Sequence, residues 1–468
     1  MYSYIRNSVL ATVVMLLLIG CVENPNVTEE VYLENPNAMR SWVVGLRRQL
    51  AVTTNTVNIN TVITSDNYYN NYTQYTKIFD RLQIDYFDTD VNNLQADIQE
   101  LRAMAIYGLD VVLPADMAAT SEQEAYLYFC LGYANLLGGE LFIGLPQNNY
   151  GEVESWEQLL ENAITAFDSA MALNTSAQMN RVYTLLQARA YYYLGDRENA
   201  VQLASQLIGQ DVLYSVEFDG QNGVSNEMQN ATFDALPNRL APLPRLDFLD
   251  PKYYSVGTPA TDQKPVAIAK VEEAYLILAE ANLGNGNLAA AQSNLLQLLQ
   301  VVENRLVAMI DDSGETRNGG DRVDYPLQEV PVRFTEEGEY QDGYVLNRQQ
   351  GAIPAYTVSG TNVTPADINS ANTLEDLLYL TYRLRQEIFI SEGRRLSDLG
   401  IKFPVSEIEQ LNNPNVPEEY IITQIPSFLP AETMDDFNVA DDGSITIIED
   451  LNRLIIQNRT LQEVVPFF

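Results

Sequence analysis

Tyrosine and amide side chains are concentrated in one short segment, DNYYNNYTQY, at residues 66–75. Aromatic rings present flat apolar faces, and amides offer both donors and acceptors of hydrogen bonds. This combination suits a ligand that alternates apolar faces with hydroxyl groups, as a carbohydrate does. We therefore predict ligand contacts from Asn67, Tyr68, Tyr69, Asn71 and Tyr72. The alternative is a buried tyrosine stripe at helical spacing, although the segment lacks the aliphatic residues that are typical of a core.

A second pair of rings, Tyr253 and Tyr254, lies in an insertion at residues 209–265 that is rich in proline, asparagine and aspartate. Long irregular segments of compact proteins are often functional. We therefore include both rings among the predicted ligand contacts. The two tryptophans, Trp42 and Trp156, lie on the apolar faces of predicted helices, and for these we expect core positions.

The chain of 468 residues contains no histidine. A Ser-His-Asp triad, a Cys-His pair and a His-ligated zinc site are therefore excluded. Catalysis by two carboxylates, as in glycosidases, stays open, but we predict no enzymatic activity and no cofactor. Some loop acids could hold structural calcium, yet none has EF-hand spacing, and we expect solvated side chains instead. These acids are Asp88, Asp90, Asp311, Asp312, Asp441 and Asp442.

The N-terminus has the pattern of a lipoprotein signal peptide. An apolar run follows Arg6 at residues 9–19, and it is too short to cross a bilayer. It ends in Leu-Ile-Gly before Cys21, as a lipobox does. We predict removal of residues 1–20, lipid on Cys21, a tether at residues 21–37 and one domain at 38–468. The alternative is an ordinary secretory signal beside a chance cysteine.

The second cysteine, Cys130, has no partner if Cys21 carries lipid, so we expect no disulfide. It lies in the apolar segment YLYFCLGYANLL, where a small buried hydrophobe is the simplest interpretation.

The chain carries 27 basic and 63 acidic residues, which gives a net charge of −36. Such a field repels nucleic acid, because phosphate contacts need Lys and Arg. Strongly anionic substrates are also disfavoured, unless a local basic patch or bound cations intervene. Acidity does not indicate disorder here, because 46% of the residues are hydrophobic and 28 are tyrosines.

Helical periodicity dominates the chain. Single amphipathic helices are predicted at residues 38–52, 91–107, 121–138 and 155–173, and a last one at 374–397. Two helical hairpins are predicted at residues 188–208 and 274–299, where Gly195 and Gly284 break the helices. Both hairpins resemble tetratricopeptide units, but the long interval between them excludes a uniform array. The predicted fold is mostly α, with tetratricopeptide-like pairs within about 121–302 and long irregular insertions.

The last predicted helix contains the charged segment RLRQEIFISEGRRLSDLG at residues 383–400. Arg383 and Glu387 are four residues apart, as are Arg394 and Asp398, so both can pair on one helical face. Composition alone predicts a structural helix.

This segment resembles the C-terminal helix of the SusD/RagB family of Bacteroidetes outer-membrane lipoproteins, of the form R-x-E-x-x-x-E-G-x-R-x-x-D-L. The matching residues are Arg385, Glu387, Glu392, Gly393, Arg395, Asp398 and Leu399, and the spacing of the early Arg and Glu matches only loosely. The lipobox, both hairpins and GELFIGLP at 139–146 occur in the order of that family.

The resemblance implies a lipid-anchored protein of the outer-membrane surface that takes part in polysaccharide utilization. It would capture an oligosaccharide or another nutrient and deliver it to a SusC-like, TonB-dependent transporter. It also implies that the charged helix is a fold element without ligand contacts. Two alternatives stay open: a helical-repeat scaffold that binds peptides for protein assembly, and a carboxylate-based glycosidase.

Overall fold

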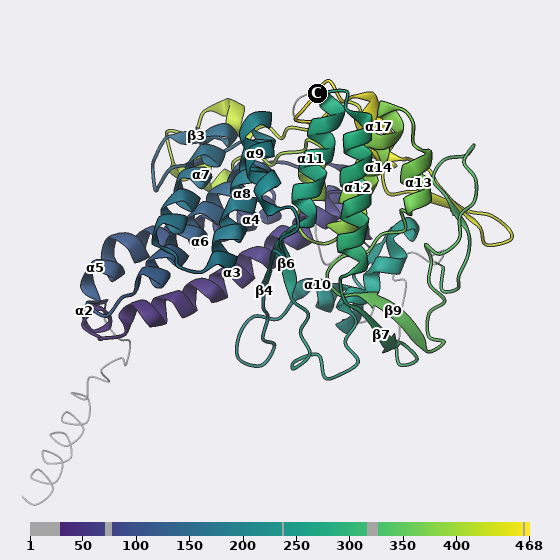
Figure 1. The fold of residues 1–468 in the computed structure, drawn as a ribbon. Helices are drawn as coiled ribbons and strands as arrows, with labels where there is room; N and C mark the ends of the chain where they lie inside the picture. Colours follow the sequence, from purple (N-terminus) through teal and green to yellow (C-terminus); the bar gives the residue numbers. More distant parts are fainter. Residues whose placement is uncertain (1–28, 71–76, 236–237, 316–325, 462–463) are drawn as a thin grey trace, which may run out of the picture.

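The computed structural model describes residues 29–70, 77–235, 238–315, 326–461 and 464–468. Helices dominate this part of the chain, and its strands are two to five residues long. Figure 1 shows helices packed side by side across the upper part of the molecule and long loops at the lower right. The mostly α fold that periodicity predicts is confirmed.

The longest helix of the described chain, α3 (Ala38–Ile63), runs beneath the others in Figure 1 and packs against α4 (Thr89–Tyr107). The sequence predicted its end at residue 52, because residues 53–63 are rich in Thr and Asn, which have low helix propensity. Burial of the segment against the core overrides that preference. The hydroxyls of Thr54 and Thr61 also donate to the carbonyls four residues earlier, each at 2.7 Å.

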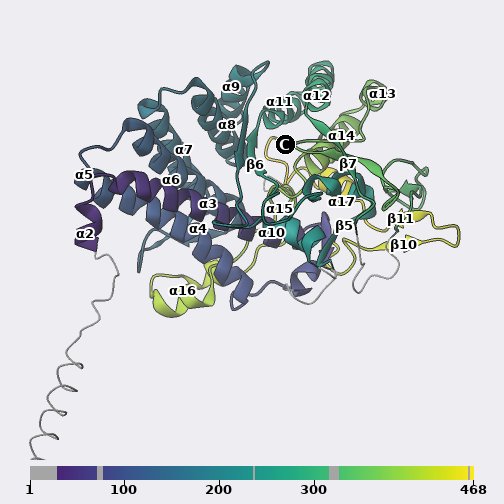
Figure 2. The ribbon, with the colours of Figure 1, turned by 90° about the horizontal axis from the view of Figure 1, so that it is seen from below.

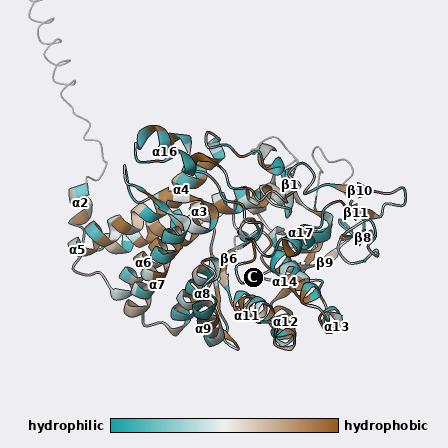
Figure 3. Cartoon of the chain, turned by 90° about the horizontal axis from the view of Figure 1, so that it is seen from above, coloured by the Kyte–Doolittle hydropathy of each residue, from teal (hydrophilic) through white to brown (hydrophobic). Residues whose placement is uncertain are grey.

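Three helical hairpins follow: α6 with α7, α8 with α9, and α11 with α12. Their helices span Ser121–Leu141, Trp156–Leu173, Ala177–Tyr193, Arg197–Leu207, Glu272–Gly284 and Leu288–Glu303. Successive hairpins pack against each other, and Figure 3 shows hydrophilic and hydrophobic residues on the same helices. The hairpins predicted at 188–208 and 274–299 are confirmed.

The two predicted turn glycines have different roles. Gly195 has a φ of 72°, a left-handed conformation that L side chains rarely adopt. In the third hairpin the left-handed residue is Gly286, with a φ of 74°, whereas Gly284 still belongs to α11. Gly284 must be small for another reason, because a Cβ atom there would lie 2.6 Å from the carbonyl oxygen of Phe467.

The helix predicted at 374–397 is two helices, α14 (Leu374–Ile388) and α15 (Arg395–Asp398). The chain turns between them through left-handed conformations at Ser391 and Gly393. At Gly393 a Cβ atom would lie 2.8 Å from a methyl group of Val57 in α3. The break lets the charged side chains of one sequence motif reach several different elements.

The charged motif is an interior ion network. Arg383 and Glu387 form the predicted pair, at 2.9 Å. The predicted pair of Arg394 with Asp398 is wrong, because Arg394 is the N-cap of the short helix α15 and its side chain pairs with other helices. Arg394 instead bonds Glu140 at 2.8 Å and Glu273 at 2.6 Å, and Arg385 bonds Asp398 at 2.7 Å. Arg395 bonds Asp66, beyond the end of α3, at 2.6 Å. The motif therefore joins the helical pairs to the rest of the fold.

Short strands form small sheets in the described part of the chain. Antiparallel pairs join β1 (Tyr68–Asn70) to β5 (Leu240–Pro242), β2 (Gly144–Pro146) to β3 (Val153–Ser155), β4 (Leu213–Val216) to β6 (Val266–Lys270), and β7 (Val307–Asp311) to β9 (Ala352–Tyr356). A three-stranded sheet places β11 (Ile445–Ile447) between an antiparallel β10 (Phe437–Val439) and a parallel β8 (Val332–Arg333). The strands β4 and β5 lie in the irregular insertion predicted at residues 209–265.

Short helices complete the described chain. The α-helices are α2 (Glu29–Leu33), α5 (Leu113–Ala115), α10 (Glu227–Gln229), α13 (Pro365–Ser370), α16 (Glu407–Asn412) and α17 (Leu451–Gln457). The 3-10 and π helices are η1 (Lys77–Arg81), η2 (Gly108–Val112), η3 (Asn230–Asp234), η4 (Pro244–Tyr253) and η5 (Glu418–Ile421). None of the described helices has the length and apolar character needed to cross a bilayer.

The C-terminal residues 464–467 pack between the second and third hairpins. The ring of Phe467 lies edge-on to that of Tyr192 in α8, with centroids 5.1 Å apart. Its backbone N–H donates to Glu280 of α11 at 3.3 Å, and its carbonyl accepts from Arg197 of α9. The chain therefore fills the space between its own hairpins.

Candidate functional site

The first three residues predicted to contact ligand lie inside the protein. Tyr68 and Tyr69 are 0% and 2% exposed, and Asn67 is 2% exposed. The hydroxyl of Tyr68 accepts from Ser391 at 3.0 Å, and the side chain of Asn67 accepts from Gln386 at 3.0 Å. The expectation of exposed side chains is wrong here, because the pairing of β1 with β5 draws them under the charged motif. Asn71 and Tyr72 lie outside the described residues.

The second predicted pair, Tyr253 and Tyr254, lies where η4 ends, and only its second ring is partly exposed. Tyr253 is fully buried, and its hydroxyl donates to the carbonyl of Ser391 at 3.1 Å, so its expected exposure is also wrong. Tyr254 is half-buried, and its ring centroid lies 5.2 Å from that of Phe233. Among the predicted rings that the structure describes, Tyr254 is the one that faces a cavity.

Of the residues expected in the core, Cys130 is buried, whereas Trp42 and Trp156 are only half-buried. Cys130 is buried, as predicted, and burial raises the pKa of its thiol to about 12. Trp42 is half-buried and donates to the carbonyl of Met104 at 2.9 Å. Trp156 is also half-buried, and the ammonium of Lys402 lies 4.7 Å from its ring centroid. Both tryptophans thus lie at the edge of the core rather than within it.

The loop acids organise turns. Asp312, expected in solvent, is fully buried and accepts backbone N–H groups of Gln349 and Gly351 at 2.8 and 3.0 Å. Asp442 accepts from the backbone N–H of Ser444 at 3.0 Å. In the described part of the chain, no three Cys, Asp or Glu side chains gather closely enough to hold a metal ion.

A groove of about 370 Å³ lies between α3, α4 and α10. Figure 2 shows α3 and α4 side by side, with α10 near the far part of α3. The lining residues are Asn55, Thr56, Ile59, Asn60 and Ile63 from α3, Asp90, Asn93, Ala96 and Asp97 from α4, Phe79 from η1 and Glu227 from α10. The lining residues Ile63 and Phe79 stand shortly before and shortly after the tyrosine-rich segment 66–75 in the sequence.

Helical spacing explains the composition of the groove. On α3, residues 55, 56, 59, 60 and 63 share one face, because side chains three and four positions apart lie above one another. Ile59, Ile63 and Phe79 are nearly fully buried and form an apolar floor. Amides, carboxylates and one hydroxyl surround this floor. In the sequence, the polar residues Asn55, Thr56 and Asn60 interrupt the apolar stripe of α3 and indicate this groove. The helix predicted at 38–52, however, ended before them.

Some groove residues hold the helices together. Asn55 donates to the carbonyl of Ser225 at 2.8 Å and accepts from the backbone N–H of Glu227 at 2.9 Å, which ties α3 to α10. The hydroxyl of Thr56 donates to the carboxylate of Asp97 across the two helices. Burial raises the pKa of Asp97, and the hydrogen bond from Thr56 opposes that rise.

Other groups in the groove remain available to a ligand. Asn93 is exposed, and its amide bonds no other described residue. The amide nitrogen of Asn60 donates to the carbonyl of Thr56 at 2.9 Å, which leaves its oxygen as an acceptor. With the carboxylate of Asp97, these groups can both donate to and accept from ligand hydroxyls above an apolar surface. The arrangement suits a neutral, hydroxyl-rich ligand.

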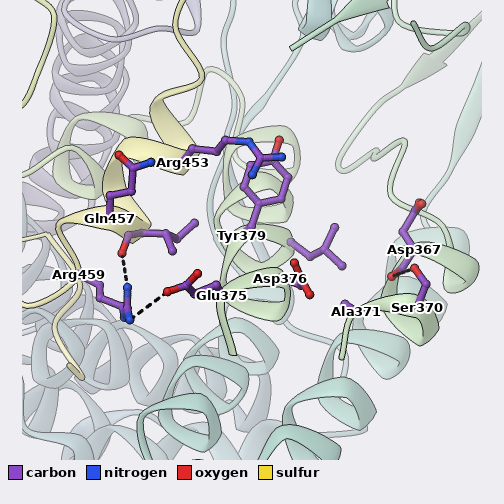
Figure 4. A pocket seen from close by; sticks show the side chains of 11 residues that line it. Asp367, Ser370, Ala371, Glu375, Asp376, Tyr379, Arg453, Gln457 and Arg459 are labelled. Carbon is purple, nitrogen blue, oxygen red and sulfur yellow. Dashed lines mark hydrogen bonds and ion pairs between the residues drawn. The ribbon is translucent and has the colours of Figure 1, made fainter. Parts of the chain in front are cut away.

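A larger cavity of about 450 Å³, shown in Figure 4, lies between α13, α14 and α17. Tyr379 lines it, but the guanidinium of Arg453 lies 4.7 Å from the ring centroid and covers that face. The Tyr379 hydroxyl donates to Asp450 at 2.8 Å, and Arg459 pairs with Glu375 at 3.3 Å. Because its ring and many of its charges are already engaged, this cavity is less suited to a sugar than the groove.

No family profile matches the chain, and no curated protein matches it significantly. Solved structures do match. A SusD superfamily protein from Bacteroides fragilis has a TM-score of 0.55 and 14% identity, over 82% of this chain and 99% of that one. A SusD-like protein from Bacteroides fragilis NCTC 9343 has a TM-score of 0.52 and 11% identity, over 84% and 98%.

A candidate sugar-binding protein from Bacteroides vulgatus ATCC 8482 is also similar, with a TM-score of 0.51 and 12% identity over 84% of this chain and 98% of that one. At such low identity the similarity concerns the backbone fold, and it extends over nearly the whole length of each of these proteins. The chain therefore has the SusD-like fold that its C-terminal motif predicted.

Proposed function

We propose that this protein binds glycans at the cell surface and delivers oligosaccharides to a SusC-like, TonB-dependent transporter. The observation that carries the proposal is the groove between α3 and α4, which combines an apolar floor with amide and carboxylate groups on a SusD-like fold. The similar fold of a candidate sugar-binding protein supports it. Asn71 and Tyr72, which lie outside the described residues, remain proposed ligand contacts from the sequence.

The proposal includes a lipid anchor on Cys21 at the outer membrane. The signal-like run before Cys21 supports it. Stable anchoring needs more than one acyl chain, which a lipidated N-terminal cysteine supplies. Replacing Cys21 by Ala should move the protein from the outer-membrane fraction to the soluble fraction of the cell. Retention of the C21A variant on the membrane would contradict the anchor but not glycan binding.

The scaffold alternative is disfavoured by the C-terminus. A peptide-binding scaffold needs an open surface between its hairpins, but residues 464–467 of this chain already pack between α8 and α11. The glycosidase alternative needs two carboxylates that act on a bound sugar. In the groove, Asp97 accepts a hydrogen bond from Thr56 and has a raised pKa, as a general acid would. Hydrolysis should therefore be tested on glycans that bind in the groove. An assay for new reducing ends on groove-bound glycans should detect none.

Affinity electrophoresis in gels that contain different neutral polysaccharides tests the binding function. We expect at least one polysaccharide to retard the protein. Asn93→Ala and Asp97→Asn should weaken that retardation, each by roughly 0.5–1.5 kcal/mol, the usual net value of one hydrogen bond. Gln300→Ala removes an exposed amide on α12, away from the groove, and serves as the matched control. Equal retardation of all four proteins would remove the groove from the proposal.

A further inference from the structure

A pocket of about 330 Å³ lies between the sheets β4–β6 and β7–β9, beside the end of η4. Figure 1 shows both sheets beneath the third hairpin. Tyr254 forms one wall, and Ser215 and Thr357 place hydroxyl-bearing side chains on the sheets. Glu217 and Lys264 stand at the rim. The apolar residues between them are mostly Ala, Pro and Ile, so the pocket is lined like a small ligand site.

The floor of this pocket holds an unusual arrangement of charge. Lys252 and Glu392 line it, and they are only 7% and 8% exposed. The ammonium of Lys252 lies 3.1 Å from Oε1 of Glu392, and that of Lys270 lies 2.8 Å from the same oxygen. Two buried ammonium groups therefore share one carboxylate.

The neighbouring charges leave this floor with an excess of one positive charge. Glu272 also acts on Lys270, but Arg305 pairs with Glu272 at 2.8 Å. The second acid that pairs with Arg305, Asp211 at 3.2 Å, has a side chain that is 85% exposed, so solvent screens its charge. The hydroxyl of the adjacent Tyr253 donates to a backbone carbonyl and carries no charge. Burial lowers the pKa of Lys270 and Lys252 lowers it further, whereas Glu392 and Glu272 oppose this shift.

One ammonium group of the floor, that of Lys252, still has a hydrogen-bond donor without an acceptor among the described residues. Lys252 donates to Glu392 and to the carbonyl of Ile390 at 3.3 Å, so one of its three N–H groups has no acceptor among the described residues. Lys270 uses all three, with Val358, Ile388 and Glu392 as acceptors. Lys252 is therefore the residue of the floor that can still bind an anion.

The walls offer a ring face and free polar groups. Tyr254 packs against Phe233 on one side and faces the pocket. Burial raises its pKa, and the acids Glu315, Asp312 and Asp311 act in the same direction, so its hydroxyl stays neutral. The hydroxyl of Ser215 and the carboxylate of Glu217 make no hydrogen bond with another described residue. Lys264 pairs with Asp262 at 2.6 Å, so only Glu217 adds net charge at the rim.

We propose that this pocket binds the acidic end of a glycan, a hexuronate whose carboxylate meets Lys252 and whose ring lies against Tyr254. The sugar part rests on the proposed function, whereas the carboxylate part rests on the charge of the floor. The volume of about 330 Å³ and the buried floor suit a single sugar unit rather than a longer chain. A local positive floor is also the feature that the net charge of −36 requires before an anionic ligand can bind.

Isothermal titration of the full-length protein with D-galacturonate and D-glucuronate, against D-galactose and D-glucose, tests the proposal. We expect a uronate to bind at least about tenfold more tightly than its neutral counterpart, the effect of one charge-assisted hydrogen bond. Tyr254→Ala should weaken binding of the uronate. Lys252→Met should abolish the preference for the uronate, provided that its circular dichroism spectrum stays unchanged.

Two variants at the rim test the uronate proposal even if Lys252→Met does not fold. Lys264→Gln removes one positive charge and leaves Asp262 unpaired, so uronate affinity should fall about threefold. Glu217→Gln removes one negative charge, so uronate affinity should rise about threefold. Equal binding of acidic and neutral sugars, no binding of uronates, or a common direction for both rim variants would overturn the proposal. Retardation by neutral polysaccharides, and its loss in Asn93→Ala, would still report on the proposed function.

Discussion

At the scale of single residues, the fold depends on a few buried charges that have several partners. Asp66 follows α3 and has 0% exposure. Arg395 bonds it at 2.6 Å, Arg245 at 2.8 Å and Gln386 at 2.9 Å. Burial alone would raise the pKa of Asp66, but Arg395 and Arg245 outweigh burial and hold it below the usual range. The ionised form of Asp66 is therefore the one that stabilises the fold.

Replacing Asp66 by Asn should lower the free energy of unfolding at pH 7 by about 3 kcal/mol or more, because the buried Arg395 loses its counter-charge and Arg245 keeps only Asp450, at 3.5 Å. The folded pKa is depressed, so the stabilisation is complete above the unfolded pKa of about 4 and disappears as pH falls through the folded value. Urea denaturation at pH 7 and pH 3 should thus show a smaller difference between D66N and the natural protein at pH 3. Glu100→Gln, at an exposed position of α4, is the control. A difference that does not change with pH would contradict this role.

At the scale of elements, close helix packing depends on glycines inside helices. In α6, a Cβ atom at Gly139 would lie 2.7 Å from the side chain of Leu160 and 2.8 Å from the carbonyl oxygen of Trp156. The backbone oxygen belongs to the first turn of α7 and cannot rotate away. The contact between α6 and α7 therefore has no room for one methyl group.

We expect Gly139→Ala to destabilise the protein by about 1–3 kcal/mol through overpacking, despite the better helix propensity of alanine. Gly45 in α3 provides the matched control, because a Cβ atom there would meet only a methionine methyl at 3.5 Å. Gly45→Ala should be neutral or stabilise by up to about 1 kcal/mol. Thermal unfolding of both variants, followed by circular dichroism, measures the difference. The prediction fails if both variants shift in the same direction by the same amount.

At the scale of the whole molecule, the C-terminus closes the helical array. Phe467 is 2% exposed between α8 and α11, whereas the adjacent Phe468 is half-buried. The carbonyl of Val464 accepts from Tyr382 of α14 at 3.1 Å. The tail thus connects the second hairpin, the third hairpin and the charged motif.

Truncation of Phe467 to Ala should cost about 3–5 kcal/mol, the usual range for a buried aromatic residue. Phe468→Ala removes the same ring one position later and should cost clearly less. Limited proteolysis should cleave the third hairpin faster in F467A than in F468A, because the packing between hairpins is lost. Equal stability and equal cleavage of the two variants would show that the tail does not hold the hairpins together.

The sequence by itself determined the helical hairpins, the lipobox-like N-terminus and the chemistry excluded by the absence of histidine. It also determined the charged motif at residues 383–400 and the SusD-like fold that this motif indicates. These features are local, because periodicity, turn residues and motif spacing are each read within a few tens of residues. The burial of Cys130 followed for the same reason.

Only the tertiary structure decided which polar residues face a cavity. Tyr68 and Tyr253 have the composition of a binding surface around them, yet both meet Ser391 inside the protein. Ion-pair partners were equally hidden, since Arg395 and Asp66 are 329 residues apart. The groove on α3 and the floor at Lys252 likewise combine distant segments. Contacts between distant segments depend on how the elements pack, which the pattern of a single segment does not contain.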